Sequence, residues 1–240
     1  MADAAWPFYV SAVIAGAAFG YVIQRGGFCL VRALANLFLM GDATIARAYG
    51  LALLVAMVAV QALAASGLVE IPVRPLHWMS NVIGGLLFGA GMVLAGGCSG
   101  STWYRVGEGA VGAWVVLLGF AMGATTVRLG SLSPVRAALQ APAVAAADGA
   151  PPTIATALGV SPWLVIAALW ILGGIWLFRS RRHQAQHGTW PWHVTGAAVG
   201  VLITAGWWAS SFGERPTGIT FAINTGELLT YPLEIGRAHV

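Results

Sequence analysis

The chain has 240 residues, of which 58% are hydrophobic and only 8% are charged. A soluble domain has about 25% charged residues, so this composition excludes a soluble enzyme, a disordered chain and a nucleic-acid-binding domain. The net charge is +4, and all 12 basic residues are arginines, because the sequence contains no lysine. Such a basic bias orients a membrane protein, and we expect no nucleic-acid partner. Two cysteines provide neither a secreted disulfide framework nor a four-ligand zinc site, and we expect no metal and no cofactor.

Long apolar runs dominate the sequence. A helix that crosses a bilayer needs about 20 apolar residues. Six runs approach this length: Phe8–Gln24, Ala46–Gly67, Trp78–Gly96, Ala110–Val127, Trp163–Phe178 and Val194–Phe212. Two shorter pieces, Phe28–Met40 and Ile219–Leu229, are predicted to be half-helices or re-entrant segments. The sequence therefore predicts an all-α polytopic membrane protein embedded in a lipid bilayer.

The arginines predict the orientation of the chain. Arg179–His183 is the densest basic stretch and is placed in the cytoplasm. Counting back through the runs places Gly41–Arg47 inside and the N-terminus outside. The Ala/Pro-rich segment 129–162 then becomes an external loop, because its prolines favour a loop over a helix.

Residues 11–29 and 80–98 form an internal repeat with an offset of 69 residues. The matched pairs are Ser11/Ser80, Val13/Val82, Ile14/Ile83, Gly16/Gly85, Phe19/Phe88, Gly20/Gly89, Gly27/Gly96 and Cys29/Cys98. We expect two repeat units within 1–128, each a broken crossing followed by a full crossing. The four glycines Gly16, Gly20, Gly85 and Gly89 are interpreted as helix-packing residues.

Each unit has glycines and a cysteine where its first apolar run breaks. The breaks are Arg25-Gly26-Gly27-Phe28-Cys29 and Gly96-Gly97-Cys98-Ser99-Gly100. Broken helices at membrane depth indicate a transporter's binding site, and the N-termini of half-helices suit an anion. Glycines there would let backbone or substrate come close. The candidate pathway residues are Gly26, Gly27, Cys29, Gly96, Gly97, Cys98 and Ser99, with buried structural cysteines as the alternative.

Charged residues near the breaks complete the candidate set. They are Arg25, Arg32, Arg105 and Glu108. Arg32 follows Cys29 in an apolar segment, where a charge needs a partner or water. Arg105 and Glu108 lie at the predicted cytoplasmic end of the second short segment, either as an interfacial ion pair or in an exit vestibule. No histidine falls inside an apolar run away from its ends, so neither a redox enzyme nor a metal site is expected.

Two motifs resemble the YeeE/YedE family of bacterial inner-membrane sulfur-compound transporters. They are Gln24–Cys29 and Gly84–Cys98, the second of which continues into Tyr104–Gly109, and the likeness extends through Gly218–Glu227. The resemblance implies thiosulfate import past cysteine thiols at the waist of an hourglass-shaped protein, with Cys29 and Cys98 at two relay positions. No covalent chemistry is needed. A cytoplasmic sulfur carrier, TusA-like, would be a partner, and the N-terminus would be periplasmic.

The sequence departs from that family near its C-terminus. Family members have a third relay cysteine in a second GGC-type motif, which is absent here, and this chain is shorter. Residues 235–240 match the in-frame translation of a common sequencing adapter. We therefore expect 163–233 to hold a connecting helix and the start of an incomplete second half, and 234–240 to be an artefact tail.

The leading hypothesis is a transporter for thiosulfate or a related small sulfur anion, and not an enzyme. One alternative is a carrier of selenium or other sulfur species. Another is a membrane thiol-disulfide oxidoreductase that cycles Cys29 and Cys98, in which serine at either position would abolish turnover. The third is a structural membrane subunit, which would tolerate alanine at both cysteines.

Overall fold

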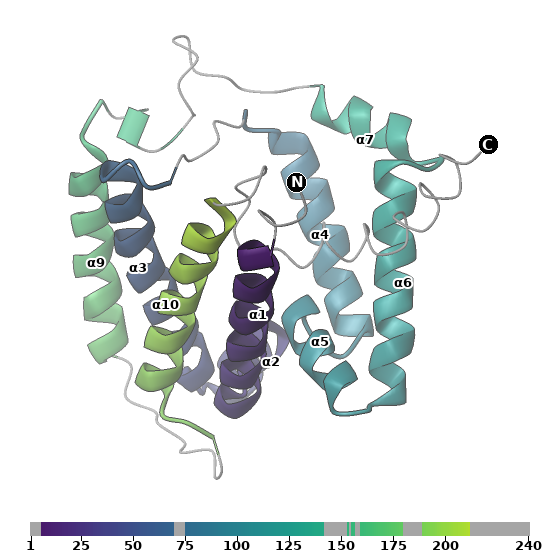
Figure 1. Ribbon diagram of the computed structural model, residues 1–240, viewed down its shortest axis with the longest axis horizontal. Helices are drawn as coiled ribbons and strands as arrows, with labels where there is room; N and C mark the ends of the chain where they lie inside the picture. The colour runs from purple at the N-terminus through teal and green to yellow at the C-terminus, as the bar shows by residue number, and fades with distance from the viewer. Residues whose placement is uncertain are drawn as a thin grey trace. The chain divides into compact units, whose positions relative to one another are not determined.

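The computed structural model describes residues 6–69, 75–141, 153, 155–156, 159–179 and 189–211. These residues form helices joined by loops, and no β-strand occurs among them. The helices are α1 (Trp6–Gly26), α2 (Leu30–Ala35), the π-helix η1 (Asn36–Met40), α3 (Thr44–Ala65), α4 (Trp78–Leu94), α5 (Ser99–Gly107), α6 (Val111–Arg128), α7 (Ser133–Gln140), α9 (Pro162–Arg179) and α10 (Trp192–Ser211). Figure 1 labels the α-helices along the chain.

Six helical segments in the described part of the chain are long and apolar enough to cross a membrane. They coincide with the six predicted runs. Two of the segments are longer than the runs: Val10–Met40 includes α2 and η1 after α1, and Trp78–Gly107 includes α5 after α4. The prediction of an all-α, multi-pass membrane protein is confirmed. Phe28–Met40 forms the short helices α2 and η1 as expected. Ile219–Leu229 and the tail 234–240 lie outside the described residues.

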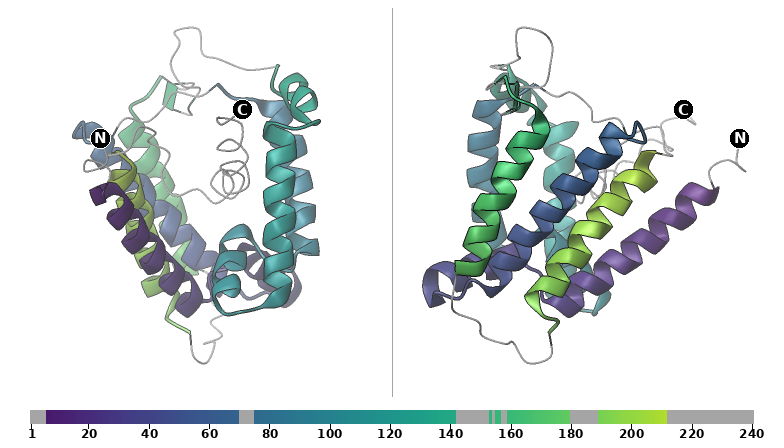
Figure 2. Two further views of the ribbon diagram at one scale, coloured as in Figure 1. Left: turned by 45° about the vertical axis from the view of Figure 1, so that its right-hand side comes forward. Right: turned by 90° about the vertical axis from the view of Figure 1, so that its left-hand side faces the viewer.

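The helices group into two compact units, and each is described by itself. The first contains α1, α2, η1, α3, α9 and α10. Its long helices form one row in the order α9, α3, α10, α1, which the right-hand view of Figure 2 shows. The predicted connecting helix, α9, and the helix that begins the predicted second half, α10, thus pack against the first repeat unit.

Small residues bring α10 against α3. A Cβ placed on Gly196 would lie 2.7 Å from the carbonyl oxygen of Ala48, and one on Gly200 would lie 2.9 Å from that of Ala52. Glycine is therefore required at both positions, as in close-packed pairs of membrane helices. This packing motif is one that the sequence analysis missed.

The glycines that were predicted to pack helices have a different environment. A Cβ on Gly16, Gly20, Gly85 or Gly89 would meet nothing within 4 Å in the described structure. Gly16 and Gly85 are exposed. Within the described residues these four glycines have no helix packed on their Cβ positions, so their role in helix packing stays a prediction.

A buried arginine ties three helices of the first unit together. Arg47, in the first turn of α3, is only 1% exposed. Its guanidinium donates to the carbonyl oxygen of Leu177 in α9 and lies 5.3 Å from the centre of the Trp192 ring in α10. The sequence predicted only that Arg47 lies on the cytoplasmic side; in the described structure its charge is enclosed by protein.

The second unit contains α4, α5, α6 and α7. Helix α5 packs on α6, and α7 packs on both α4 and α6. The segment that contains α7 was predicted to be a loop, and this is corrected for Ser133–Gln140. Pro134 lies in the first turn of α7, where a helix needs no N–H donor, so this proline is compatible with the helix.

Candidate pathway site at the two helix breaks

The first break ends α1 with a left-handed turn at Gly27. Gly27 has a φ of 57°, and its N–H donates to the Gln24 carbonyl at 3.2 Å. The next N–H, of Phe28, donates to the Ile23 carbonyl at 3.0 Å. Positive φ disfavours a β-carbon, so this C-cap requires glycine. The backbone is then extended at Cys29, which precedes α2.

The second break has the same backbone hydrogen bonds. Gly96 has a φ of 64°, and its N–H donates to the Val93 carbonyl at 3.1 Å. The N–H of Gly97 donates to the Met92 carbonyl at 3.2 Å, and Cys98 is extended before α5. Each donor and acceptor lies 69 residues after its counterpart in the first break. The two cysteines therefore follow equivalent turns at equivalent positions.

Cys98 caps the N-terminus of α5. Its sulfur accepts a hydrogen bond from the N–H of Ser101 at 3.4 Å. The hydroxyls of Ser101 and Thr102 donate to the Cys98 carbonyl at 2.9 and 3.1 Å. Ser101 is only 2% exposed and Thr102 is also buried. The first turn of α5 thus fixes the backbone and the sulfur of Cys98 together.

The first break is covered by neighbouring helices. Cys29 is 7% exposed, and its side chain does not cap α2. The ring of Phe28 stacks on that of Tyr49 from α3, with centroids 3.8 Å apart and an interplanar angle of 20°. The N–H of Trp190, just before α10, donates to the Arg25 carbonyl at 3.2 Å. Both cysteines are present as thiols.

The remaining two glycines of the breaks are surrounded by side chains. A Cβ on Gly26 would lie 2.8 Å from Oγ1 of Thr195, and one on Gly97 would lie 2.7 Å from Oγ of Ser101. Neither glycine has a positive φ. The Cβ position of each glycine is therefore occupied by a neighbouring side chain. Thr195 and Ser101 were missed, and their signal is a polar residue in a membrane helix.

The structure brings Arg105 back to the second break. Its Nη1 donates to the Gly96 carbonyl at 3.5 Å, so its charge lies at the C-terminal end of α4, where a cation is favourable. From its place in the sequence, Arg105 was expected at the cytoplasmic end of the second short segment, away from the break. Ser99 is the first residue of α5 and Glu108 follows its last. Arg32, in α2, is exposed on the first unit.

An apolar pocket of about 1020 Å³ adjoins the second break. Helices α4, α5, α6 and α7 line it, and Gly97, Ser99 and Thr102 form its boundary at the break. Its walls are mostly aliphatic and aromatic, with Arg128 and Arg136 also on the lining. The first turn of α5 therefore lies beside a volume large enough for a small hydrated anion. Among the described residues, no group of three or more His, Cys, Asp or Glu could hold a metal.

Comparison with known proteins adds a family to this geometry. A family model described as sulphur transport matches residues 25–238. The chain is 33% identical to a protein of Spirochaeta thermophila named thiosulfate transporter TsuA, in an alignment that covers 86% of this chain and 65% of that protein. It is 29% identical to the Escherichia coli protein of the same name, with coverages of 92% and 66%.

A third relative aligns over a shorter region. The chain is 39% identical to a Salmonella typhimurium protein named probable transporter YedE, over 48% of this chain and 28% of that protein. The chain thus spans 65% and 66% of the length of the two proteins named thiosulfate transporters.

Proposed function

The chain belongs to the sulphur transport family, and from this premise we propose that it imports thiosulfate or a related small sulfur-containing anion. The proposed pathway passes Cys29 and Cys98. The observation on which the proposal rests is the matching construction of the two breaks, each with a left-handed glycine followed two residues later by a cysteine. Two similar proteins are named thiosulfate transporters, which supports this choice of substrate.

The chemistry of thiosulfate fits a thiol relay. Thiosulfate is a dianion with a polarisable terminal sulfur, and moving it through an apolar waist removes water from a charge at a cost of several kcal/mol or more. A neutral thiol donates a weak S–H hydrogen bond that stabilises the passing sulfur and is easily broken. At Cys98 the Ser101 N–H donates to the sulfur, which holds the thiol at the first turn of α5 beside the pocket.

Positive potential around the relay would attract the anion. The first turn of α5 provides N–H groups and the positive end of a helix dipole beside the pocket. Arg105 adds a full charge near Gly96, but its side chain is exposed. We therefore assign Arg105 to attraction of the anion and the thiols to its passage, because an ion pair at the waist would retain the substrate.

The proposal also covers the orientation of the protein in the membrane, its partner protein and the division of the chain into repeat units. We place the protein in the bacterial inner membrane with a periplasmic N-terminus, and Arg179–His183 in the cytoplasm. A TusA-like sulfur carrier would receive the imported sulfur there. Residues 1–128 would be two repeat units, 129–162 a periplasmic segment, and 163–233 the beginning of a second half.

Growth on thiosulfate as the sole sulfur source tests the proposal directly. The gene that encodes this chain is expressed in bacteria without thiosulfate uptake of their own, and entry of ³⁵S-thiosulfate is measured. Cys29→Ala and Cys98→Ala should each reduce uptake sharply, whereas Gly16→Ala, at an exposed position of α1, should not. Near-normal uptake by the Cys29→Ala/Cys98→Ala double variant would exclude the relay.

Serine variants and competing substrates separate the alternatives. Serine keeps a hydrogen-bond donor but cannot form a disulfide, so residual uptake by Cys29→Ser and Cys98→Ser supports the relay over thiol-disulfide chemistry. Competition of selenite or sulfate with labelled thiosulfate measures the selectivity. Stronger uptake of a selenium species than of thiosulfate would show that thiosulfate is not the main substrate.

A further inference from the structure

We infer that Thr195 of α10 is a positioning residue for the first cysteine break, where its contact with Gly26 fixes the end of α1 and hence the place of Cys29. This inference rests on the proposed function for its meaning in transport. Gly26 is followed directly by the left-handed Gly27, so a displacement at Gly26 moves the whole turn. The contact between Thr195 and Gly26 involves protein atoms alone, so it can be tested without measuring transport.

The second repeat shows that the backbone does not require glycine at this position. The residue 69 positions after Gly26 is Ala95, which has helical angles of φ −72° and ψ −11°. Gly26 also has no positive φ. Glycine at 26 is therefore explained by its neighbour, since a Cβ there would lie 2.8 Å from Oγ1 and 3.0 Å from Cβ of Thr195. Contacts this short force a shift of α1 or α10.

Thr195 has little freedom to move aside. It is 1% exposed, and its hydroxyl donates to the Pro191 carbonyl at 3.3 Å. The next residue, Gly196, is pressed against the backbone of α3 at Ala48. The methyl and hydroxyl of Thr195 are therefore held against α1 by the α3–α10 packing.

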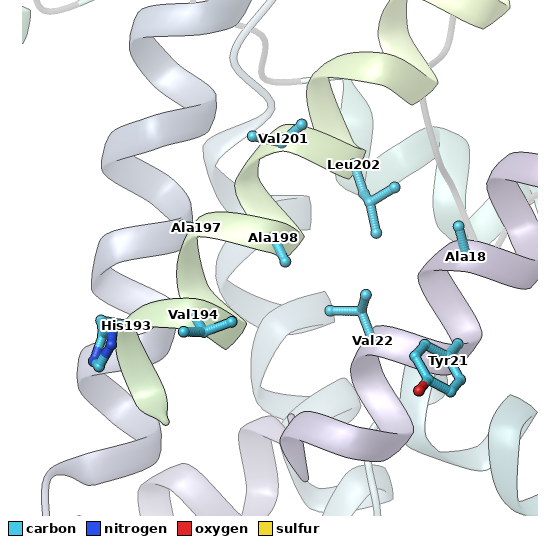
Figure 3. Close-up of a pocket in the computed structure, with 9 residues that line it drawn as sticks. All are labelled: Ala18, Tyr21, Val22, His193, Val194, Ala197, Ala198, Val201 and Leu202. Atoms are coloured by element: carbon cyan, nitrogen blue, oxygen red, sulfur yellow. The ribbon is translucent and has the colours of Figure 1, made fainter. Parts of the chain in front are cut away.

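A second contact from the same segment acts on the same turn of α1. The N–H of Trp190 donates to the Arg25 carbonyl, and the Trp190 ring packs edge-on against the Tyr21 ring, with ring centroids 5.8 Å apart. An apolar groove of about 670 Å³ lies along α1 and α10 beside this contact; Tyr21 is on its lining, and Val22 of α1 and Leu202 of α10 point into it (Figure 3). Helix α10 thus holds α1 at the end that carries the break.

The two breaks are therefore positioned in different ways. At the second break, Ser101 and Arg105 from the following helix contact Gly97 and Gly96. At the first, the corresponding restraint comes from α10, far along the chain. Changes in α10 should accordingly alter the environment of Cys29 and leave that of Cys98 unchanged.

The test compares Gly26→Ala, Thr195→Gly and the double variant in native membranes. The rate at which a small maleimide modifies Cys29 is measured by mass spectrometry, with Cys98 in the same molecule as the internal reference. Gly26→Ala should raise the Cys29 rate roughly tenfold, as expected for an overpacked contact, and leave the Cys98 rate unchanged. The double variant should return the Cys29 rate towards that of Thr195→Gly. Gly20→Ala, on the open side of α1, and Ala95→Gly are the controls.

A Cys29 rate in Gly26→Ala equal to that of the wild type, or a double variant no better than Gly26→Ala, would overturn the inference. Global unfolding is distinguished by a simultaneous rise in the Cys98 rate, and it also counts against a local role for Thr195. Thiosulfate uptake is measured on the same variants, and recovery in the double variant is expected. If the wild type takes up no thiosulfate, the proposed function fails, while the alkylation rates still decide whether Thr195 positions Cys29.

Discussion

The N–H of Ser101 donates to the sulfur of Cys98 at 3.4 Å. A side chain that would face the substrate in the proposed pathway thereby also serves as the N-cap of α5. No such cap is made by Cys29 at the start of α2. Substitutions at the two equivalent cysteines should consequently differ in their effect on stability.

We predict that Cys98→Ala destabilises the protein by about 1 kcal/mol, the usual value of an N-cap, whereas Cys98→Ser does not, because serine is a strong N-cap. Thermal unfolding in detergent, followed by size-exclusion chromatography, measures the difference. Cys29→Ala and Cys29→Ser provide the matched pair, and their unfolding temperatures should differ less than those of Cys98→Ala and Cys98→Ser. Equal losses for Cys98→Ala and Cys98→Ser would contradict the capping role.

The left-handed glycines of the breaks should not tolerate a β-carbon. Gly27→Ala and Gly96→Ala each place a side chain at positive φ, which costs roughly 1–2 kcal/mol, and both variants should lose stability and uptake. Gly91→Ala in α4 is the control, because a Cβ there would meet nothing within 4 Å of the described structure and alanine favours a helix. The prediction fails if Gly96→Ala unfolds at the same temperature as Gly91→Ala.

Arg47 should be essential for stability because it joins α3 to α9 and α10. Arg47→Met removes the hydrogen bond to the Leu177 carbonyl and the contact with Trp192, and we expect a loss of about 2 kcal/mol, typical of a hydrogen bond to a charged group. Arg32→Met, at an exposed arginine of the same unit, should unfold as the wild type does. Similar unfolding temperatures for the two methionine variants would show that Arg47 does not join the helices.

The contact between α3 and α10 should depend on glycine at 200. Gly200→Leu drives a side chain into the Ala52 carbonyl and should prevent folding, which is observed as loss of monodisperse protein after extraction. Gly20→Leu makes the same change in α1, where a Cβ meets nothing within 4 Å among the described residues, and should fold. Recovery of folded protein at equal yields from both variants would contradict the packing.

The membrane helices could be predicted from the sequence because the bilayer demands long apolar runs, and their observed ends differ only slightly from the predicted ones. The repeat located both breaks, since Gly27 and Gly96 are glycines for a local, conformational reason. Helix α7 was missed because prolines were taken as loop residues without regard to their place in a turn.

Contacts between distant segments could not be predicted in the same way. Gly16 and Gly20 have the same spacing as Gly196 and Gly200, but only the second pair lies against another helix in the described structure. The Thr195–Gly26 contact joins residues far apart in the chain, and no local pattern specifies it. For the same reason the position of Arg105 at the Gly96 carbonyl was missed, because it depends on the reversal of the chain at the break.

The position of α10 between α1 and α3 bears on how the protein is made. The ribosome delivers α1 and α3 early, but the helix that joins them is synthesised only after all of α4 to α7. Such a non-local contact forms late, after the intervening chain has entered the membrane. Helices α4 to α7, in contrast, are consecutive and can associate as they emerge. The surroundings of the turn before Cys98 therefore come from helices that are consecutive in the chain, whereas those of the turn before Cys29 include α10 and require a helix that is synthesised much later.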